Sequence, residues 1–329
     1  CIGCGLLRES SVTRDLAAAP GIRAGIVQGN LSTKEKGDVR YLDVNLERYR
    51  SVSAQVIAEG AEVLFWPESV MNQWTPEDLP NVRGTKADPF PAAAVPLVYG
   101  GLAYRLKPEM HGELAESHAA AQRKRHFSFN TAFGLDEHGN VTGVYHKQVL
   151  MPFGEYMPFA DIFPALRALS PHTGDFTPGD RKAPIVLQVK RAAQNSAPVS
   201  LRAGALICYE DLVPSLSREA VAHGANILVN LTNDAWYGKT AAPYQHNLLA
   251  QWRAIETRRY LLRVTNTGLT AVIDPLGRTV QQLPLFSEGY LISDVRLLNA
   301  VTVYSKVGDL PVWVISAISL LYCFRRRKA

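Results

Sequence analysis

Short apolar strands alternate with amphipathic helices along most of the chain, and this order limits the folds open to it. Strands are predicted at residues 21–28, 62–66, 97–104, 203–207, 226–231 and 260–265. Helices are predicted at 41–59, 215–223 and 244–259, where apolar residues recur at helical spacing. Hairpins at 127–146 and 270–282 interrupt the alternation. The sequence therefore predicts an α/β fold with mixed sheets covered by helices, not a pure doubly wound sheet.

The chain is long enough for one large packed domain, with 329 residues of which 47% are apolar. We expect a remnant of a membrane segment and linker at 1–20, a catalytic domain at 21–300 and an anchor with a basic tail at 301–329. Residues 107–125 are polar and are expected to form a surface excursion. The net charge is only +5, and four cations lie together in the run 325–328, so a nucleic-acid partner is not expected.

The C-terminal run 310–324 is uncharged and mostly apolar, and Arg-Arg-Arg-Lys follows it. As a helix it would be about 22 Å long, shorter than the roughly 30 Å hydrocarbon core of a bilayer. It is either a buried or amphipathic terminal helix or a membrane anchor. The basic cluster and the aromatic residues Trp313 and Tyr322 favour the anchor, which would leave the tail cytoplasmic and the main domain on the other side.

The four cysteines are Cys1, Cys4, Cys208 and Cys323. Cys1 and Cys4 have the spacing of a redox or zinc pair, but no second pair accompanies them and no strand precedes them. Cys208 is the one cysteine within the predicted globular part, so no internal disulfide is expected there.

Cys208 directly follows the predicted buried strand 203–207, and Pro214 soon turns the chain toward a helix. The carboxyl end of a strand is where α/β folds place ligands and chemistry. The N-terminus of a following helix favours a thiolate. The alternative is that Cys208 is a small core hydrophobe, as many free cysteines are.

Glu68 and Lys147 also follow predicted strands, and together with Cys208 they offer a set of catalytic groups. A thiol is mostly protonated near neutral pH and needs a neighbouring base to become a nucleophile. Glu68 would take the thiol proton, and Lys147 and the backbone N–H of Tyr209 would stabilise an oxyanion. These groups predict acyl transfer through a thioester. Taken singly, Glu68 and Lys147 could each be ordinary surface residues, and Glu155 a loop carboxylate.

Ordered motifs surround these three residues. They are Trp66-Pro67-Glu68-Ser69, the run 145–156, Ile207-Cys208-Tyr209-Glu210, the first strand 25–30, the loop 233–238 and Gln245-His246. With them the chain resembles the nitrilase superfamily and, within it, the apolipoprotein N-acyltransferase family, over about residues 21–324.

The resemblance implies an αββα sandwich of the nitrilase type with a terminal membrane helix. It implies that Glu68 is the general base, Lys147 the oxyanion stabiliser and Cys208 the nucleophile. Three further residues, Glu155, Tyr209 and Glu210, are implied to support the site. Trp236 and Tyr237 are implied to lie in a loop that binds substrate near the lipid entry.

The implied reaction takes an acyl chain from a phospholipid onto Cys208 and then transfers it to the α-amine of a diacylglyceryl-cysteine lipoprotein. It implies no cofactor and no metal. It also implies the bacterial inner membrane, with the catalytic domain on the extracytoplasmic side. The family carries a bundle of membrane helices ahead of this domain, whereas this sequence has only the short apolar run 1–7 there.

Three alternatives remain open from the residues. A soluble amidase or other carbon–nitrogen hydrolase of the same superfamily would share Glu68, Lys147 and Cys208 but would not need residues 310–328. A Cys–His hydrolase would use a histidine as its base, chosen from His146, His223 and His246. On a strand, however, His146 and Lys147 face opposite sides. The last alternative is a lipid- or lipoprotein-binding module without catalysis.

Overall fold

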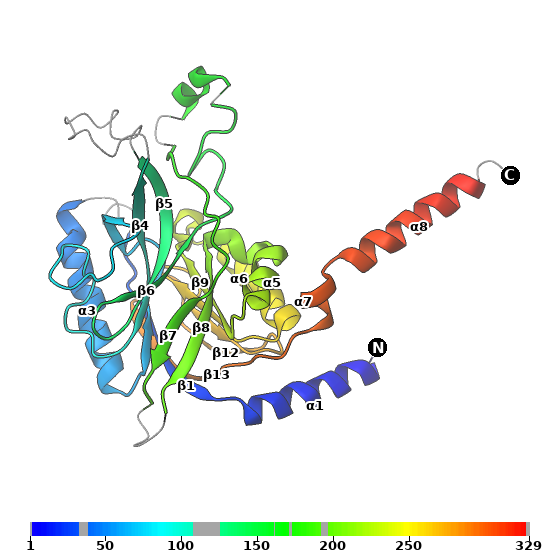
Figure 1. Ribbon diagram of the computed structural model, residues 1–329, viewed down its shortest axis with the longest axis horizontal. Helices are drawn as coiled ribbons and strands as arrows, with labels where there is room; N and C mark the ends of the chain where they lie inside the picture. Colours follow the sequence, from blue (N-terminus) through cyan, green and yellow to red (C-terminus); the bar gives the residue numbers. More distant parts are fainter. Residues whose placement is uncertain are drawn as a thin grey trace.

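The computed structural model describes residues 2–32, 39–107, 126–160, 162–170, 173–191 and 197–326. Within them two mixed β-sheets pack face to face, and helices cover the two outer faces (Figure 1). The layer order is helix, sheet, sheet, helix, which confirms the expected αββα arrangement. The predicted excursion beyond Lys107 lies outside the described residues.

The first sheet has the strand order β13-β1-β2-β4-β5-β6, with β3 beside β4. The strands are β1 Gly21–Gln28, β2 Val63–Phe65, β3 Met71–Pro76, β4 Leu97–Leu106, β5 His126–Leu135, β6 Val141–His146 and β13 Gly289–Arg296. β2 is parallel to β4, β4 is antiparallel to β5, and β5 is antiparallel to β6. β2 and β6 therefore run in the same direction, so the residues that follow them emerge at the same edge of the sheet.

The second sheet has the strand order β12-β11-β10-β9-β8-β7. The strands are β7 Ile185–Val189, β8 Val199–Ile207, β9 Ile227–Thr232, β10 Leu261–Thr265, β11 Ala271–Ile273 and β12 Thr279–Gln282. β8, β9 and β10 are parallel, and the other pairings are antiparallel. Cys208, which follows β8, and the loop after β9 therefore share one edge of this sheet.

Three apolar clusters fill the spaces between the layers and hold them together. Between the sheets, side chains such as Ile26 and Phe65 from the first sheet meet Val229 and Leu262 from the second. Helix α3 (Leu42–Ala58) packs Leu46, Val52 and other residues onto the outer face of the first sheet. Helices α5 (Pro214–Ala222) and α6 (Ala242–Thr257) cover the outer face of the second sheet. All three helices begin and end within three residues of the predicted bounds.

The sequence did not predict β3 or β13, and it left β7 within a region, 181–198, expected to be a hairpin or loop. Among the described residues of this region the structure has one strand, β7, and it pairs antiparallel with β8, so the hairpin includes the cysteine strand itself. β13 pairs antiparallel with β1 along its whole length. Residues 289–292 of β13 are half-buried, because this strand is the edge of its sheet, so its apolar alternation is weak.

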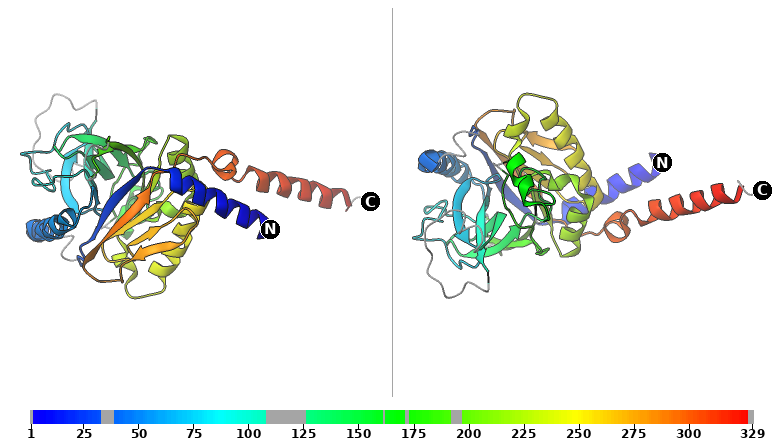
Figure 2. Two further views of the ribbon diagram at one scale, coloured as in Figure 1. Left: turned by 90° about the horizontal axis from the view of Figure 1, so that it is seen from below. Right: turned by 90° about the horizontal axis from the view of Figure 1, so that it is seen from above.

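The terminal helices α1 (Ile2–Ala18) and α8 (Leu310–Arg326) extend away from the sandwich in the same general direction (Figures 1 and 2). The short helix α7 (Val303–Val307) connects the body to α8. In α8 many large apolar side chains are exposed, among them Trp313, Ile315, Leu321 and Phe324. Among the described helices, none is both long enough and apolar enough to cross a membrane.

Candidate active site

Cys208 is the first residue of a tight 3₁₀ turn, η4 (Cys208–Leu212), that directly follows β8. Its φ angle is +56°, in the left-handed region that non-glycine residues rarely adopt. Such a backbone costs on the order of 1–3 kcal/mol and is most often retained at functional sites. The Asn230 side chain, from the neighbouring strand β9, donates a hydrogen bond of 2.8 Å to the Cys208 carbonyl and holds the turn.

Lys147 follows β6 directly and is only 2% exposed. Its backbone N–H donates to the Asn130 carbonyl, and its own carbonyl accepts from the N–H of Gly179, both at 2.8 Å. Its ammonium Nζ lies 2.8 Å from Oε2 of Glu155 and 5.2 Å from the centre of the Tyr209 ring. Lys147 is thus fixed against the residue that follows Cys208.

Glu68 and Glu155 are joined by one amide. Asn130 Nδ2, on β5, donates to Oε1 of Glu68 at 2.9 Å and to Oε1 of Glu155 at 3.0 Å. Glu155 Oε2 also accepts from the backbone N–H of Met151 at 2.8 Å. Sequence reasoning missed Asn130, because an asparagine beside Ser128 and Thr131 in a strand forms no recognisable catalytic pattern. The structure therefore brings the two predicted carboxylates and Lys147 into one cluster.

Electrostatic interactions extend this cluster to the sulfur of Cys208. Burial, followed by the charge of Glu68, raises the pKa of the Cys208 thiol to about 12, although the charge of Lys147 opposes both effects. Burial lowers the pKa of Lys147, but the charges of Glu68, Cys208 and Glu155 outweigh burial and raise it. At neutral pH the resting site therefore holds a protonated thiol beside a charged ammonium, and the thiol must lose its proton when it attacks.

Glu210 is fully buried and bridges the two sheets. Its carboxylate accepts hydrogen bonds from the backbone N–H groups of Gln148, Val149 and Ile207 at 2.6 to 3.0 Å and from the Tyr145 hydroxyl at 2.9 Å. Burial raises the pKa of Glu210 to about 7, and these hydrogen bonds oppose that rise. Glu210 thus ties the segment after Lys147 to the end of β8. Tyr209 does the same, because its hydroxyl donates to the Leu150 carbonyl at 2.8 Å.

Trp236 and Tyr237 lie in the 3₁₀ turn η5 (Asp234–Tyr237), in the loop after β9. Tyr237 is half-buried, and burial, followed by the charge of Cys208, raises its pKa. The Trp236 side chain is 80% exposed.

The three histidines considered for a Cys–His hydrolase have their described contacts elsewhere. The His146 ring lies 2.8 Å from the Thr131 hydroxyl and 3.0 Å from Glu77. His246 contacts two buried aspartates, and His223 contacts a backbone carbonyl of its own helix. In the part of the chain that the structure describes, the charged side chains found to shift the pKa of Cys208 are Glu68, Lys147 and Glu155, and no histidine is among them.

No cluster of three or more potential metal ligands occurs among the described residues. Cys1 lies outside them, as does the side chain of Cys4, so the Cys1–Cys4 spacing stays a sequence observation.

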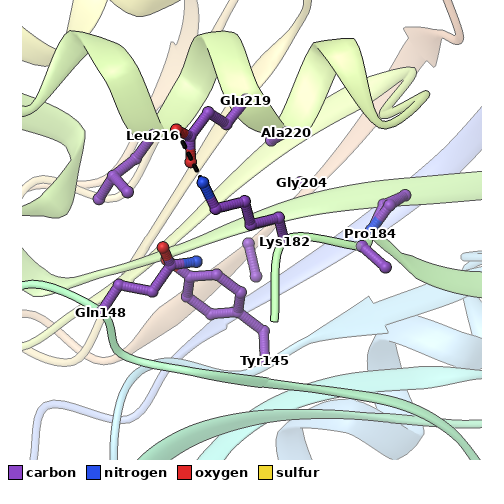
Figure 3. A pocket seen from close by; sticks show the side chains of 10 residues that line it. Tyr145, Gln148, Lys182, Pro184, Gly204, Leu216, Glu219 and Ala220 are labelled. Atoms are coloured by element: carbon purple, nitrogen blue, oxygen red, sulfur yellow. Dashed lines mark ion pairs between the residues drawn. The ribbon is translucent and has the colours of Figure 1, made fainter. Parts of the chain in front are cut away.

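A small pocket lies behind the site, between β8 and α5 (Figure 3). Tyr145 and Gln148 line one side of it, and the Lys182–Glu219 ion pair, 3.0 Å long, lines the other. Its volume of about 10 Å³ is enough for one water molecule and not for a substrate. The pocket therefore belongs to the packing behind Glu210.

Comparisons with known proteins agree with this fold. The carbon–nitrogen hydrolase family model matches residues 23–303. An apolipoprotein N-acyltransferase of Geobacter metallireducens is 33% identical over 93% of this chain and 54% of its own length. One from Pseudomonas putida is 29% identical, with the same two coverages. The chain spans about half the length of these curated relatives.

Solved structures show the same fold at lower identity. An amidase from Nesterenkonia sp. AN1 matches with a TM-score of 0.52 and 20% identity, over 84% of this chain and 94% of the amidase. Nit3 of Saccharomyces cerevisiae, of the nitrilase superfamily, matches with a TM-score of 0.53 and 16% identity, over 84% of this chain and 90% of Nit3. With a nitrilase-type sandwich and a family model that matches most of its length, the chain belongs to the carbon–nitrogen hydrolase family.

Proposed function

We propose that this protein transfers an acyl chain from a phospholipid to the N-terminal amine of diacylglyceryl-cysteine lipoproteins. The observation that carries the proposal is the cluster of Glu68, Lys147 and Glu155 around the turn of Cys208. Two relatives that match 93% of the chain are apolipoprotein N-acyltransferases, which favours this reaction over hydrolysis.

In the first step Glu68 takes the proton from the Cys208 sulfur as the sulfur attacks the ester carbonyl of a phospholipid acyl chain. The Lys147 ammonium and the backbone N–H of Tyr209 stabilise the negative oxygen that forms. The intermediate collapses, the carbon–oxygen bond of the ester breaks, and Glu68 returns the proton to the departing alkoxide. A thioester on Cys208 and a lysophospholipid result.

In the second step the α-amine of the lipoprotein cysteine attacks the thioester carbonyl, and Glu68 accepts a proton from the amine. The carbon–sulfur bond then breaks, the thiolate regains a proton, and the product is an amide. Water would compete with the amine for the thioester, so the site must be shielded during this step.

The remaining polar residues act through Glu68, Lys147 and Cys208. Glu155 keeps Lys147 charged and in place. Tyr209 and Glu210 hold the segment after Lys147 against the end of β8, where Cys208 lies. Tyr237 follows Trp236 in the same turn, and the exposed ring of Trp236 is suited to contact the substrate lipid.

We further propose three segments, with a membrane remnant and linker at 1–20, the catalytic domain at 21–300, and an anchor at 301–329. The exposed apolar side chains of α8 and the basic run that follows it support attachment to the bacterial inner membrane, with the catalytic domain on the extracytoplasmic side. The loop after Lys147 supports contact with lipid as well, since Phe153, Phe159 and Phe163 are all exposed on it.

The reaction is tested with the chain in vesicles of phosphatidylethanolamine that carries labelled acyl chains, together with a synthetic diacylglyceryl-cysteine peptide. The expected product is a labelled amide at the peptide N-terminus. Glu68→Gln is expected to lower its rate about 10²- to 10⁴-fold, because the general base is lost. Glu47→Gln, at an exposed position on α3, is the matched control and is expected to leave the rate unchanged. An unlabelled peptide together with rapid hydrolysis of small amides would identify an amidase instead.

Gly100 on β4 gives a second prediction, because it lies directly beneath Glu68. A Cβ atom at this position would lie 2.5 Å from Cα of Glu68 and 2.6 Å from the Pro67 carbonyl oxygen. Since these are backbone atoms, Gly100→Ala must displace Glu68, and we expect the acyl-transfer rate to fall about 10- to 100-fold. Gly101→Ala is the control, because its Cβ would meet its nearest neighbours at 3.3 Å or more. Equal rates for both variants would show that the position of Glu68 is unimportant.

A further inference from the structure

Four charged side chains are buried together behind the turn of Cys208, and the reaction steps above use none of them. They are Asp211 in η4, Asp234 in η5, His246 in α6 and Arg263 in β10, and each is at most 5% exposed. Charged groups are rarely buried unless they are paired, so this cluster requires an explanation.

Each of the two carboxylates contacts both of the basic side chains. Arg263 donates from Nη1 to Asp211 at 2.7 Å and from Nη2 to Asp234 at 2.9 Å. The Nε2 atom of His246 lies 2.7 Å from Asp211, and its Nδ1 atom lies 3.1 Å from Asp234. The imidazole therefore bridges η4 to η5, with Arg263 beneath them both.

This bridge connects two parts of the proposed active site. Asp211 belongs to the same 3₁₀ turn as Cys208. Arg263 also approaches Asn230, the residue that holds the Cys208 carbonyl. On the other side, Asp234 begins the turn that ends at Tyr237, whose ring meets the imidazole edge-on at 6.3 Å. A shift of His246 would move the sulfur relative to the loop beside it.

The proton count on His246 decides the charge of the cluster. A neutral ring would accept at Nδ1 from Arg263 Nη2, 3.0 Å away, and leave two carboxylates facing one guanidinium. A protonated ring donates to both carboxylates and gives zero net charge. Because an uncompensated buried charge is strongly destabilising, charge balance favours the protonated ring. Burial lowers the pKa of His246, but its bonds to Asp211 and Asp234 outweigh burial and raise it.

We propose that His246 is a positioning residue, a buried imidazolium that locks the turn of Cys208 to the loop of Trp236 and Tyr237. It orients the thiol against Lys147 and takes no part in the bond changes. The proposal rests on the proposed role of Cys208 as the nucleophile.

The test measures how fast iodoacetamide alkylates Cys208 in the folded chain. His246→Gln removes the positive charge and is expected to slow alkylation about 10- to 100-fold, because small displacements at a reacting centre cost this much. His223→Gln is the control, since His223 is exposed and contacts its own helix, and it is expected to react as the wild type does. Asp211→Asn combined with His246→Gln restores the charge balance and is expected to recover part of the lost rate.

A second measurement does not depend on how a variant folds. In the wild-type chain, ¹⁵N spectra of the His246 ring, assigned through contacts to Tyr237, are expected to show protons on both nitrogens at pH 7. A neutral ring would overturn the proposal. So would a His246→Gln variant that melts at a lower temperature but alkylates at the wild-type rate. Alkylation needs no lipid, so a slowed His246→Gln variant supports the positioning role even if no acyl transfer is found.

Discussion

Cys208→Ala is expected to fold normally and to transfer no acyl chain. Alanine occupies a left-handed backbone no less readily than cysteine, and the Asn230 hydrogen bond goes to the carbonyl of residue 208, so the turn keeps its shape. Without the sulfur, however, no thioester can form. Loss of a catalytic nucleophile costs about 10⁴-fold or more, so the transfer rate should fall below detection. The measurement is labelled acyl transfer from phospholipid to a diacylglyceryl-cysteine peptide.

Cys323→Ala is the matched control, because it removes the other described free cysteine, exposed on α8, without touching the site. It is expected to transfer at the wild-type rate. Cys208→Ser should be nearly as inactive as Cys208→Ala, since a hydroxyl is a far weaker nucleophile than a thiolate in this setting. A Cys208→Ala chain that keeps a tenth of the wild-type rate would remove Cys208 from the mechanism.

Lys147→Met is expected to lower both the rate and the stability. Loss of one oxyanion donor costs about 10²- to 10³-fold in kcat. Removal of one partner from a buried ion pair also destabilises a protein by about 3–5 kcal/mol. Lys147 is only 2% exposed and its Nζ lies 2.8 Å from Oε2 of Glu155, so its loss removes the partner of a buried carboxylate. Single-turnover formation of the acyl-enzyme and urea unfolding measure the two effects separately.

Lys190→Met is the control for Lys147→Met, because Lys190 also pairs with a glutamate, Glu137, but is 74% exposed. It is expected to unfold at the wild-type urea midpoint and to react at the wild-type rate, since exposed pairs contribute little. If Lys147→Met formed the acyl-enzyme as fast as Lys190→Met, the oxyanion role of Lys147 would be excluded.

The positions of most strands, and of the polar residues that end β2, β6 and β8, could be predicted from the sequence, because apolar periodicity and turn residues are local signals. Local signals could not predict that Glu68 and Lys147 emerge at the same edge of the first sheet. This arrangement depends on β5, which reverses the chain between β4 and β6 and makes β6 parallel to β2. Strand order is a long-range property with no local pattern, so the motif resemblance alone predicted this convergence.

The residues that support the site could not be predicted from local sequence patterns either. Asn130, which joins the two carboxylates, is one of two adjacent buried polar residues in β5, and the sequence does not show which of them faces the site. The resemblance predicted that Glu210 supports the site, but its hydrogen bonds to Gln148 and Val149 depend on how the two sheets pack. The sequence offers His246 as a possible base and as part of the motif Gln245-His246, but its bridge between Asp211 and Asp234 exists only in the folded chain.

Tandem mass spectrometry after incubation with phospholipid carrying ¹³C-labelled acyl chains tests most directly whether Cys208 carries the acyl group. The expected result is one labelled acyl group on the peptide that contains Cys208, removable by neutral hydroxylamine as a thioester is, and strongly reduced in Glu68→Gln and Lys147→Met. A label on another residue, a hydroxylamine-resistant bond, or equal labelling in these two variants would contradict acyl transfer by a Glu68–Lys147–Cys208 site.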